Sequence, residues 1–315
     1  MVKMTMKRSL FTILLICCVI AQLGIPGGSS AATIVAIMSS DQPRYHEAHR
    51  AFVKSIATHG YKAPATEIIL HTPNSDPLSW AAEVHKLNSS RPDLIVTYGA
   101  PASLTAVCES AGIPVVSVDV FTPDHPLKGM CGVSSRVSMV TLLKTLLGVR
   151  SYQRIGVLYS PRESGSQQQL EDVKKFAVQL GIILVEGSVQ TAAALEGELN
   201  RLLSKTEAVI VTEGGLFSQH FEHIIARSKT RKIPIVSTMP GASEKGALMS
   251  LEINPGELGY LAAEIAARIL EGAKSEFLPL IPPQRIDLVI NIRSAQELGV
   301  EIPFAIQHSA TRLIK

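Results

Sequence analysis

Short β-branched runs alternate with helical patterns along most of this sequence, and few fold classes can accommodate that alternation. In the first half, the predicted strands occupy residues 33–38, 67–70, 93–98 and 113–118, with helical patterns at 46–59, 78–87 and 102–111 between them. The strand runs are apolar throughout rather than alternating with polar residues. They therefore predict a parallel sheet that is covered by helices on both faces.

The same pattern begins again after residue 136. A helical pattern at 137–147 leads into predicted strands at 154–159, 182–185, 208–211 and 233–236, with helices at 167–180, 192–203 and 218–229. The two halves also contain a similar short segment: Gly-Ile-Pro-Val-Val-Ser at 112–117 and Lys-Ile-Pro-Ile-Val-Ser at 232–237. The predicted fold class is α/β, with two doubly wound parallel-sheet lobes.

Three segments are predicted to cross between the lobes, at residues 132–135, 247–253 and 279–289. After the second crossing, apolar residues recur at helical spacing from Leu258 to Ile269, which predicts an amphipathic helix packed on the first lobe. We expect an N-terminal lobe of residues 32–135 plus 252–282 and a C-terminal lobe of residues 136–251 plus 283–315. A multi-strand hinge would join them.

The first 31 residues have the layout of a secretory signal peptide. Lys3, Lys7 and Arg8 precede the apolar run 10–20, and small residues at 29–31 offer a cleavage site. An uncleaved anchor and a lipid-modified Cys17 or Cys18 are the alternatives. We expect a periplasmic protein, without stable membrane insertion after cleavage.

The overall charge argues against a nucleic-acid partner. The chain has 30 Lys and Arg against 27 Asp and Glu, and the leader holds three of the basic residues and none of the acidic ones. The remainder is therefore balanced, whereas a nucleic-acid-binding protein needs a basic stripe.

Two cysteines, Cys108 and Cys131, remain once the leader is removed. An oxidising compartment would allow them to form a disulfide. The alternative is a pair of buried free thiols, since unpaired cysteine is commonly buried.

Several short motifs, most of them in the second half of the chain, occur in the same order as in a known family. They include Glu-Leu-Gly at 257–259, Ile-Leu-Glu-Gly at 269–272 and Ala-Gln-Glu-Leu-Gly-Val-Glu-Ile-Pro at 295–303, with the strands at 92–99 and 154–161 also matching. The chain resembles substrate-binding proteins of ABC transporters with the type I periplasmic binding-protein fold, in the branch that includes receptors for tryptophan and related amino acids.

That resemblance implies a monomeric solute receptor without a cofactor or catalytic role, which closes around a small organic ligand and delivers it to ABC transporter permease subunits. Three departures lie near the expected ligand. The segment 119–129 is compressed, Pro255-Gly256 replaces a tyrosine pair, and 212–215 reads Thr-Glu-Gly-Gly. We expect this chain to share the fold of the family. The resemblance does not predict which ligand the chain binds.

Ligands of open α/β sheets bind beyond the carboxyl ends of the strands. Two facing lobes would then form a cleft between two rows of loops. The candidate ligand-binding residues are Ser39, Ser40, Tyr98, Gly99, Ala100, Ser103, Asp119 and Phe121 on the first lobe, Ser160, Glu163, Ser164, Ser166, Thr212, Glu213, Gly214 and Thr238 on the second, and Asn254 after the second crossing.

Within this set, the segment from Gly99 to Ser103 is the best candidate for a carboxylate site, because it ends a strand and opens a helix. Ser103, Ser164 and Ser166 could instead serve only as helix caps. Asp119 and Glu213 could receive a ligand ammonium or hydroxyl, or could pair internally. We therefore expect an amino acid or a similar carboxylate as the ligand.

The sequence gives little support for metal binding or for catalysis. The two His-x-x-His pairs, His46/His49 and His220/His223, lack an acidic third ligand, so no metal site is expected. No nucleophile elbow or phosphate-binding loop follows a strand, which argues against an exported enzyme. A receptor that presents its ligand to a membrane histidine kinase is the main alternative to import.

Overall fold

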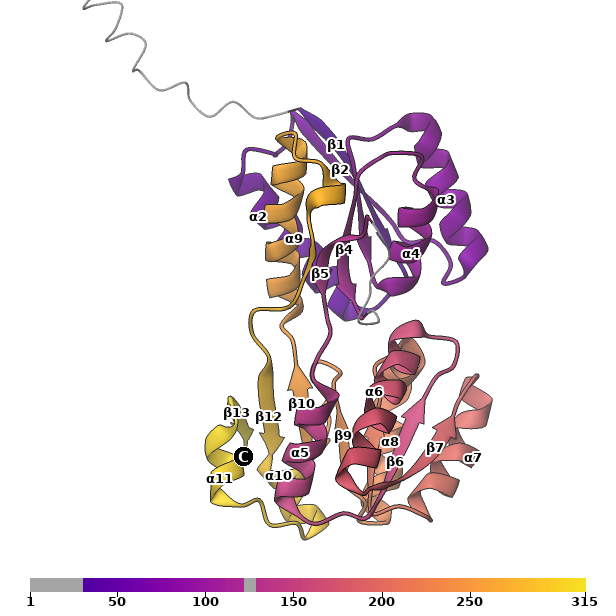
Figure 1. Ribbon diagram of the computed structural model, residues 1–315, viewed down its shortest axis with the longest axis vertical. Helices are drawn as coiled ribbons and strands as arrows, with labels where there is room; N and C mark the ends of the chain where they lie inside the picture. The colour runs from indigo at the N-terminus through magenta and orange to yellow at the C-terminus, as the bar shows by residue number, and fades with distance from the viewer. Residues whose placement is uncertain (1–30, 122–128) are drawn as a thin grey trace, which may run out of the picture.

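The computed structural model describes residues 31–121 and 129–315, which form two α/β lobes, one above the other in Figure 1. Apart from Ala31, the residues of the predicted signal peptide lie outside the described residues. The predicted fold class is confirmed: each lobe contains a central sheet with helices on both faces.

The N-terminal lobe is built on a fully parallel six-stranded sheet with the order β11-β5-β4-β3-β1-β2. Its strands are β1 (Ala32–Met38), β2 (Thr66–His71), β3 (Leu94–Tyr98), β4 (Val115–Val120), β5 (Cys131–Ser134) and β11 (Leu280–Ile281). Its helices are α2 (Pro43–Thr58), α3 (Pro77–Ser90), α4 (Ala100–Glu109) and α9 (Pro255–Leu270), with a 3-10 turn, η1 (Ser275–Phe277). Alternate β1 residues face opposite sides, so α2 and α9 cover one face and α3 and α4 the other.

The C-terminal lobe contains a seven-stranded sheet with the order β13-β12-β10-β9-β8-β6-β7, in which only the β10–β12 pair is antiparallel. Its strands are β6 (Arg154–Tyr159), β7 (Ile183–Ser188), β8 (Ala208–Val211), β9 (Ile235–Ser237), β10 (Met249–Glu252), β12 (Asp287–Asn291) and β13 (Arg312–Ile314). Its helices are α5 (Met139–Val149), α6 (Ser164–Leu180), α7 (Ala192–Leu203), α8 (Gly215–Thr230), α10 (Ile292–Leu298) and α11 (Phe304–Ser309). Helices α5 and α6 cover one face, and α7 and α8 cover the other.

Three segments pass between the sheets: the link from β5 to α5, the link from β10 to α9, and the link from β11 to β12. In the first link, Arg136 donates two hydrogen bonds to the Asp172 carboxylate on α6, at 2.8 and 2.9 Å. Its guanidinium also lies 5.8 Å from the centre of the Phe121 ring, which follows β4. Arg136 thus contacts an element of each lobe. The lobe boundaries stay predictions.

Both remaining cysteines are free thiols, so the disulfide alternative for Cys108 and Cys131 is wrong. Cys131 is buried on the face of the sheet that α2 and α9 cover, and its thiol donates to the Val115 carbonyl oxygen at 3.2 Å. Cys108 is exposed on α4, which covers the other face. The sheet therefore separates the two sulfurs, and burial raises the pKa of Cys131 to about 11.

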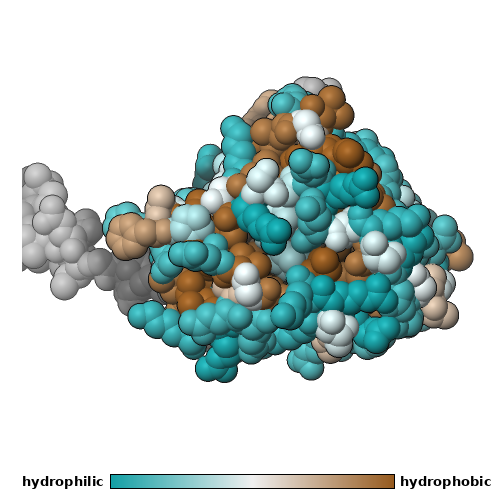
Figure 2. All heavy atoms as spheres, turned by 90° about the horizontal axis from the view of Figure 1, so that it is seen from below, coloured by the Kyte–Doolittle hydropathy of each residue, from teal (hydrophilic) through white to brown (hydrophobic). Residues whose placement is uncertain are grey.

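The face seen from below, onto the C-terminal lobe, is largely hydrophilic with hydrophobic patches (Figure 2). None of the helices within residues 31–121 and 129–315 combines the length and the apolar character needed to span a bilayer.

Close packing of α2 on α9 depends on Gly259. A Cβ atom at this position would lie 2.0 Å from the carbonyl oxygen of Ala48 and 2.9 Å from the backbone nitrogen of Phe52. Only glycine allows the two backbones to approach this closely. The contact also fixes the position of α2, whose first turn reaches the other lobe.

Gly259→Ala is expected to destabilise the protein by about 1–3 kcal/mol, because overpacking a helix contact forces the backbones apart. Gly197→Ala in α7 is the matched control. A Cβ there meets nothing within 4 Å, so alanine should stabilise its helix by up to about 1 kcal/mol. Urea unfolding followed by circular dichroism measures both changes, and equal stability of the two variants would contradict the packing argument.

Candidate ligand site between the lobes

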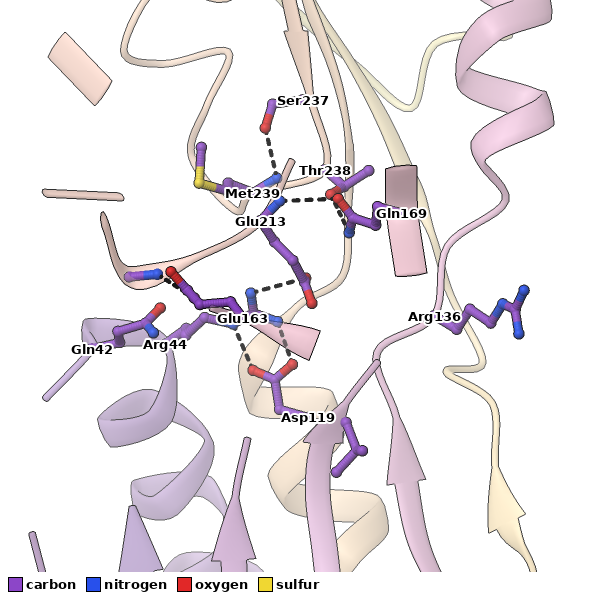
Figure 3. Close-up of polar contacts among 12 residues, drawn as sticks. Gln42, Arg44, Asp119, Arg136, Glu163, Gln169, Glu213, Ser237, Thr238 and Met239 are labelled. Carbon is purple, nitrogen blue, oxygen red and sulfur yellow. Dashed lines mark hydrogen bonds and ion pairs between the residues drawn. The ribbon is translucent and has the colours of Figure 1, made fainter. Parts of the chain in front are cut away.

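The carboxyl ends of the parallel strands of both sheets face the space between the lobes. Asp119 lies at the end of β4 in the N-terminal lobe, and Glu213 comes two residues after β8 in the C-terminal lobe. The two side chains approach the same guanidinium, that of Arg44 (Figure 3). The strand-end rule thus brings together two predicted residues that are far apart in the sequence.

Arg44 is the cation at this meeting point, and it comes from the first turn of α2. Its Nε donates to Asp119 Oδ2 at 2.6 Å and its Nη2 donates to Asp119 Oδ1, so the pair is bidentate. Its Nη1 donates to Glu213 Oε2 at 3.3 Å. Burial disfavours the charge, but the two carboxylates outweigh burial and raise the pKa of Arg44.

Asp119 has an unusual backbone conformation. Its φ is +60°, in the left-handed region, and the pairing of β4 with β5 shifts register between Val118 and Val120. Aspartate is one of the few residues besides glycine that tolerates this region. The side chain, which has no exposed surface, is thereby directed at Arg44 instead of continuing the strand pattern.

A short series of hydrogen bonds within the C-terminal lobe positions the backbone of Glu213. Its backbone N–H donates to Gln169 Oε1 at 2.9 Å, and Gln169 Nε2 donates to the Thr238 hydroxyl at 2.9 Å (Figure 3). Burial raises the pKa of the Glu213 carboxyl to about 7, against the lowering effect of Arg44. Nearby Asp119 and Glu163 add to the rise.

Glu163 supports the start of α8. Its carboxylate accepts hydrogen bonds from the N–H groups of Gly215 at 2.8 Å and Leu216 at 3.5 Å. An anion at a helix N-terminus is favourable because the unpaired N–H groups and the helix dipole point toward it. Burial nevertheless raises the pKa of Glu163. A Cβ at Gly214 would lie 2.8 Å from both carboxylate oxygens, so this position needs a small residue.

The charges at this point do not balance. Arg44 satisfies Asp119 with two hydrogen bonds but reaches Glu213 through only one long contact. Glu163 adds a third carboxyl group. The site thus has more acidic than basic side chains, which favours a ligand with a positive group.

The predicted carboxylate site at the start of α4 is engaged within the protein. The Ser103 hydroxyl donates to the Gly99 carbonyl oxygen and bonds with Thr97, both at 2.8 Å. Ser39 accepts from the N–H of Ala102 at 3.0 Å. Ala100, also a candidate, is buried in the first turn of this helix. Ser103 therefore neither caps the helix nor has an exposed hydroxyl.

The other predicted hydroxyl and amide residues mostly serve local structure. Ser166 accepts from the N–H of Ser160 at 2.8 Å and bonds with Thr212 at 2.6 Å. Ser164 is exposed and makes no cap, because Glu163 is the N-cap of α6. Asn254 caps α9 through the N–H groups of Gly256 and Glu257.

The two predicted aromatic residues, Tyr98 and Phe121, are buried in the hydrophobic core. Tyr98 is fully buried and its hydroxyl bonds with His49 Nδ1 at 3.1 Å. Burial, with a further contribution from His46, lowers the pKa of His49 to about 4, so the ring is neutral at pH 7. Phe121 is buried beneath Arg136.

Sequence reasoning missed three residues of this site: Gln42, Arg44 and Gln169. The predicted helix began at residue 46, whereas α2 begins at Pro43 and places Arg44 in its first turn. Gln42 donates to the Ser40 hydroxyl at 2.9 Å. The available signal was a proline at a helix start shortly after a strand.

One hollow in the surface lies outside this site. An open hollow of about 620 Å³ is lined by α4, the start of β4 and the residues after α9. It therefore lies at the amino end of β4, opposite Asp119. Within the described residues, no group of three or more His, Cys, Asp or Glu side chains could hold a metal ion.

The raised pKa of Glu213 predicts a pH-dependent contribution to stability. Between its ordinary value of 4.5 and about 7 the folded protein holds an extra proton, so this contribution falls as the pH rises through that range. Glu213→Gln should remove that slope, whereas Glu171→Gln, at an exposed carboxylate, should keep it. Urea unfolding at a series of pH values measures the slope; an unchanged slope in Glu213→Gln would count against this assignment.

Comparisons with known proteins identify the family of the chain. The family model described as "ABC transporter substrate binding protein" matches residues 33–314. The tyrosine-binding protein of Clostridioides difficile strain R20291 is 24% identical over 274 residues, which cover 83% of this chain and 79% of that relative.

Two solved structures share the fold. The ABC domain in complex with L-Trp from Streptococcus pneumonia has a TM-score of 0.83 and 24% identity, covering 90% of this chain and 100% of that one. The ligand-free, open structure of a substrate binding protein with adhesive properties from Clostridium difficile has a TM-score of 0.70 and 24% identity, covering 90% and 99%. With the family model matching nearly all of the described residues, the chain belongs to the family of ABC transporter substrate-binding proteins.

Proposed function

We propose that the protein is the extracytoplasmic receptor of an ABC importer, that it closes its two lobes around an amino acid, and that it delivers this ligand to the permease. The observation that carries the proposal is the meeting of Asp119 and Glu213 between the lobes, with more acidic than basic side chains around them. A ligand ammonium supplies the positive charge that Glu213, with its single long contact to Arg44, lacks.

Closure follows from the origin of the two carboxylates. Asp119 belongs to the N-terminal lobe and Glu213 to the C-terminal lobe, so a single ammonium reaches both only when the lobes are together. Such a ligand binds the closed form more tightly than the open form, which is the condition for shifting the equilibrium toward closure. Hinge closure around ligand is the general behaviour of periplasmic binding proteins.

The carboxylate of the amino acid is assigned to the start of α4. The positive end of this ten-residue helix lies at the same sheet edge as Asp119. Ser39 and Ser103 would exchange part of their present hydrogen bonding for the ligand. Two similar proteins support an amino acid as the ligand class: one named for tyrosine and one solved with L-Trp.

The proposal also includes export. The charged start, apolar run and small residues of 1–31 are those of a cleaved signal peptide, after which a monomeric receptor would act in the periplasm. The permease would recognise the closed arrangement of the two lobes.

The test separates the two charged groups of the ligand. Native mass spectrometry of the exported protein first looks for a co-purified small molecule. Calorimetry then compares L-tyrosine with tyramine, which lacks the carboxylate, and with 3-(4-hydroxyphenyl)propionate, which lacks the ammonium. L-Tyrosine or another amino acid of a wider panel should bind, and the matched acid without its ammonium should not. Tight binding of a sugar with no response to any amino acid would refute the ligand class.

Asp119→Asn and Glu213→Gln should each weaken amino-acid binding about tenfold or more, because a hydrogen bond to a charged group contributes about 1.5–3 kcal/mol. Glu171→Gln, which removes an exposed carboxylate on α6, is the control and should bind normally. Calorimetry gives the affinities, and circular dichroism checks that each variant is folded. Normal affinity in both cleft variants would place the ligand ammonium elsewhere.

A further inference from the structure

The contact between the lobes at Arg44 is made entirely by the protein's own side chains. Arg44 and Asp119 both come from the N-terminal lobe, and Glu213 comes from the C-terminal lobe. We infer that the Arg44 guanidinium acts as an internal cation that competes with the ligand for Glu213 and latches the two lobes together. The latch rests on geometry alone, whereas the identity of its competitor rests on the function proposed above.

The latch is ionic and shielded from water. Side-chain exposure is 15% for Arg44, 0% for Asp119 and 14% for Glu213. Charge pairs are stronger in such surroundings than at an open surface, and removing one partner leaves the other buried without compensation. The Arg44–Glu213 contact is therefore expected to influence how far the lobes open.

Arg44 also occupies a position that local helix energetics disfavour. It lies in the first turn of α2, where the positive end of the helix dipole repels a cation, and no acidic residue accompanies it there. Its compensation comes from Asp119 and Glu213. A residue that breaks a local rule and is compensated across a cleft is typical of a functional position.

Among the described residues, two further contacts between the lobes near Arg44 involve uncharged groups. A Cβ at Gly215 would lie 3.4 Å from Gln42 Nε2, so the start of α2 lies against the start of α8. A Cβ at Gly165 would lie 3.3 Å from the Cβ of Phe121. These neighbours fit together closely, but they supply no attraction comparable with the Arg44–Glu213 pair.

Competition follows from the distances. Arg44 Nη1 lies 3.3 Å from Glu213 Oε2, which leaves no room for an ammonium between the two groups. A ligand cation that binds Glu213 must therefore displace Nη1, while the bidentate pair with Asp119 can persist. Arg44 then stays paired with Asp119, whose oxygens have further lone pairs that accept a hydrogen bond from the ligand ammonium, and Glu213 is paired with the ligand. Arg44 is in this sense a specificity-determining residue, since only a cationic group can replace it.

The test removes the latch and then restores its charge from solution. Small-angle X-ray scattering of the exported, extensively dialysed protein measures the radius of gyration. Arg44→Ala should increase this radius relative to the wild type. Guanidinium or methylammonium chloride at non-denaturing concentration should reduce it again, because either cation fits the vacated place. Sodium chloride at the same ionic strength should not.

A variant on the other lobe keeps the test decisive if Arg44→Ala folds poorly. Glu213→Gln removes the partner on the other lobe and should also increase the radius, and the double variant should open no further than either single one. Arg227→Ala is the control, because Arg227 pairs with Glu196 inside the C-terminal lobe. It should leave the radius unchanged.

An unchanged radius in both Arg44→Ala and Glu213→Gln would overturn the latch. Opening of Arg44→Ala that neither organic cation reverses would overturn the competition. The scattering measurement uses no amino acid, so its failure is distinct from a failure of the calorimetric panel.

Discussion

A buried carboxylate needs a compensating cation, and this requirement organises the space between the lobes. Asp119 and Glu213 come from different sheets, yet each is directed at the same guanidinium. Parallel strands make this meeting possible, because in each lobe they bring their carboxyl ends to one edge. The close approach of α2 to α9 at Gly259 supports the same arrangement, since it positions the helix whose first turn presents Arg44.

Most of the fold could be predicted from the sequence because its strands are buried on both faces. The run of β8 is apolar from end to end, that of β6 is apolar from Ile155 to Leu158, and helices of ten residues or more separate the two strands. The C-terminal elements α10, α11 and β13 escaped prediction. Two short helices and a strand of three residues carry too little periodicity, and β13 exists only through its pairing with β12.

The candidate site was only partly predictable. Asp119 and Glu213 follow from the strand-end rule, which needs no side-chain geometry. Arg44 does not, because its role depends on a partner 169 residues away across the cleft. The roles of the serine hydroxyls were hard to predict for the same reason. Ser103 and Ser166 lie near the starts of α4 and α6, but each hydroxyl is hydrogen-bonded to a neighbour that only the fold brings close. Likewise, only the sheet between Cys108 and Cys131 shows that they cannot pair.

Three chain segments, rather than one, join the two sheets. A single link would let the lobes twist and slide freely, whereas three links side by side restrict them to bending about one axis. In the proposed closure, these links are the axis about which the lobes rotate. Arg136 binds Asp172 close to the links, and Arg44 meets Glu213 further from them (Figure 3). In that closure, a rotation about the links displaces the Arg44–Glu213 contact further than the Arg136–Asp172 contact, because Arg44 lies further from the links.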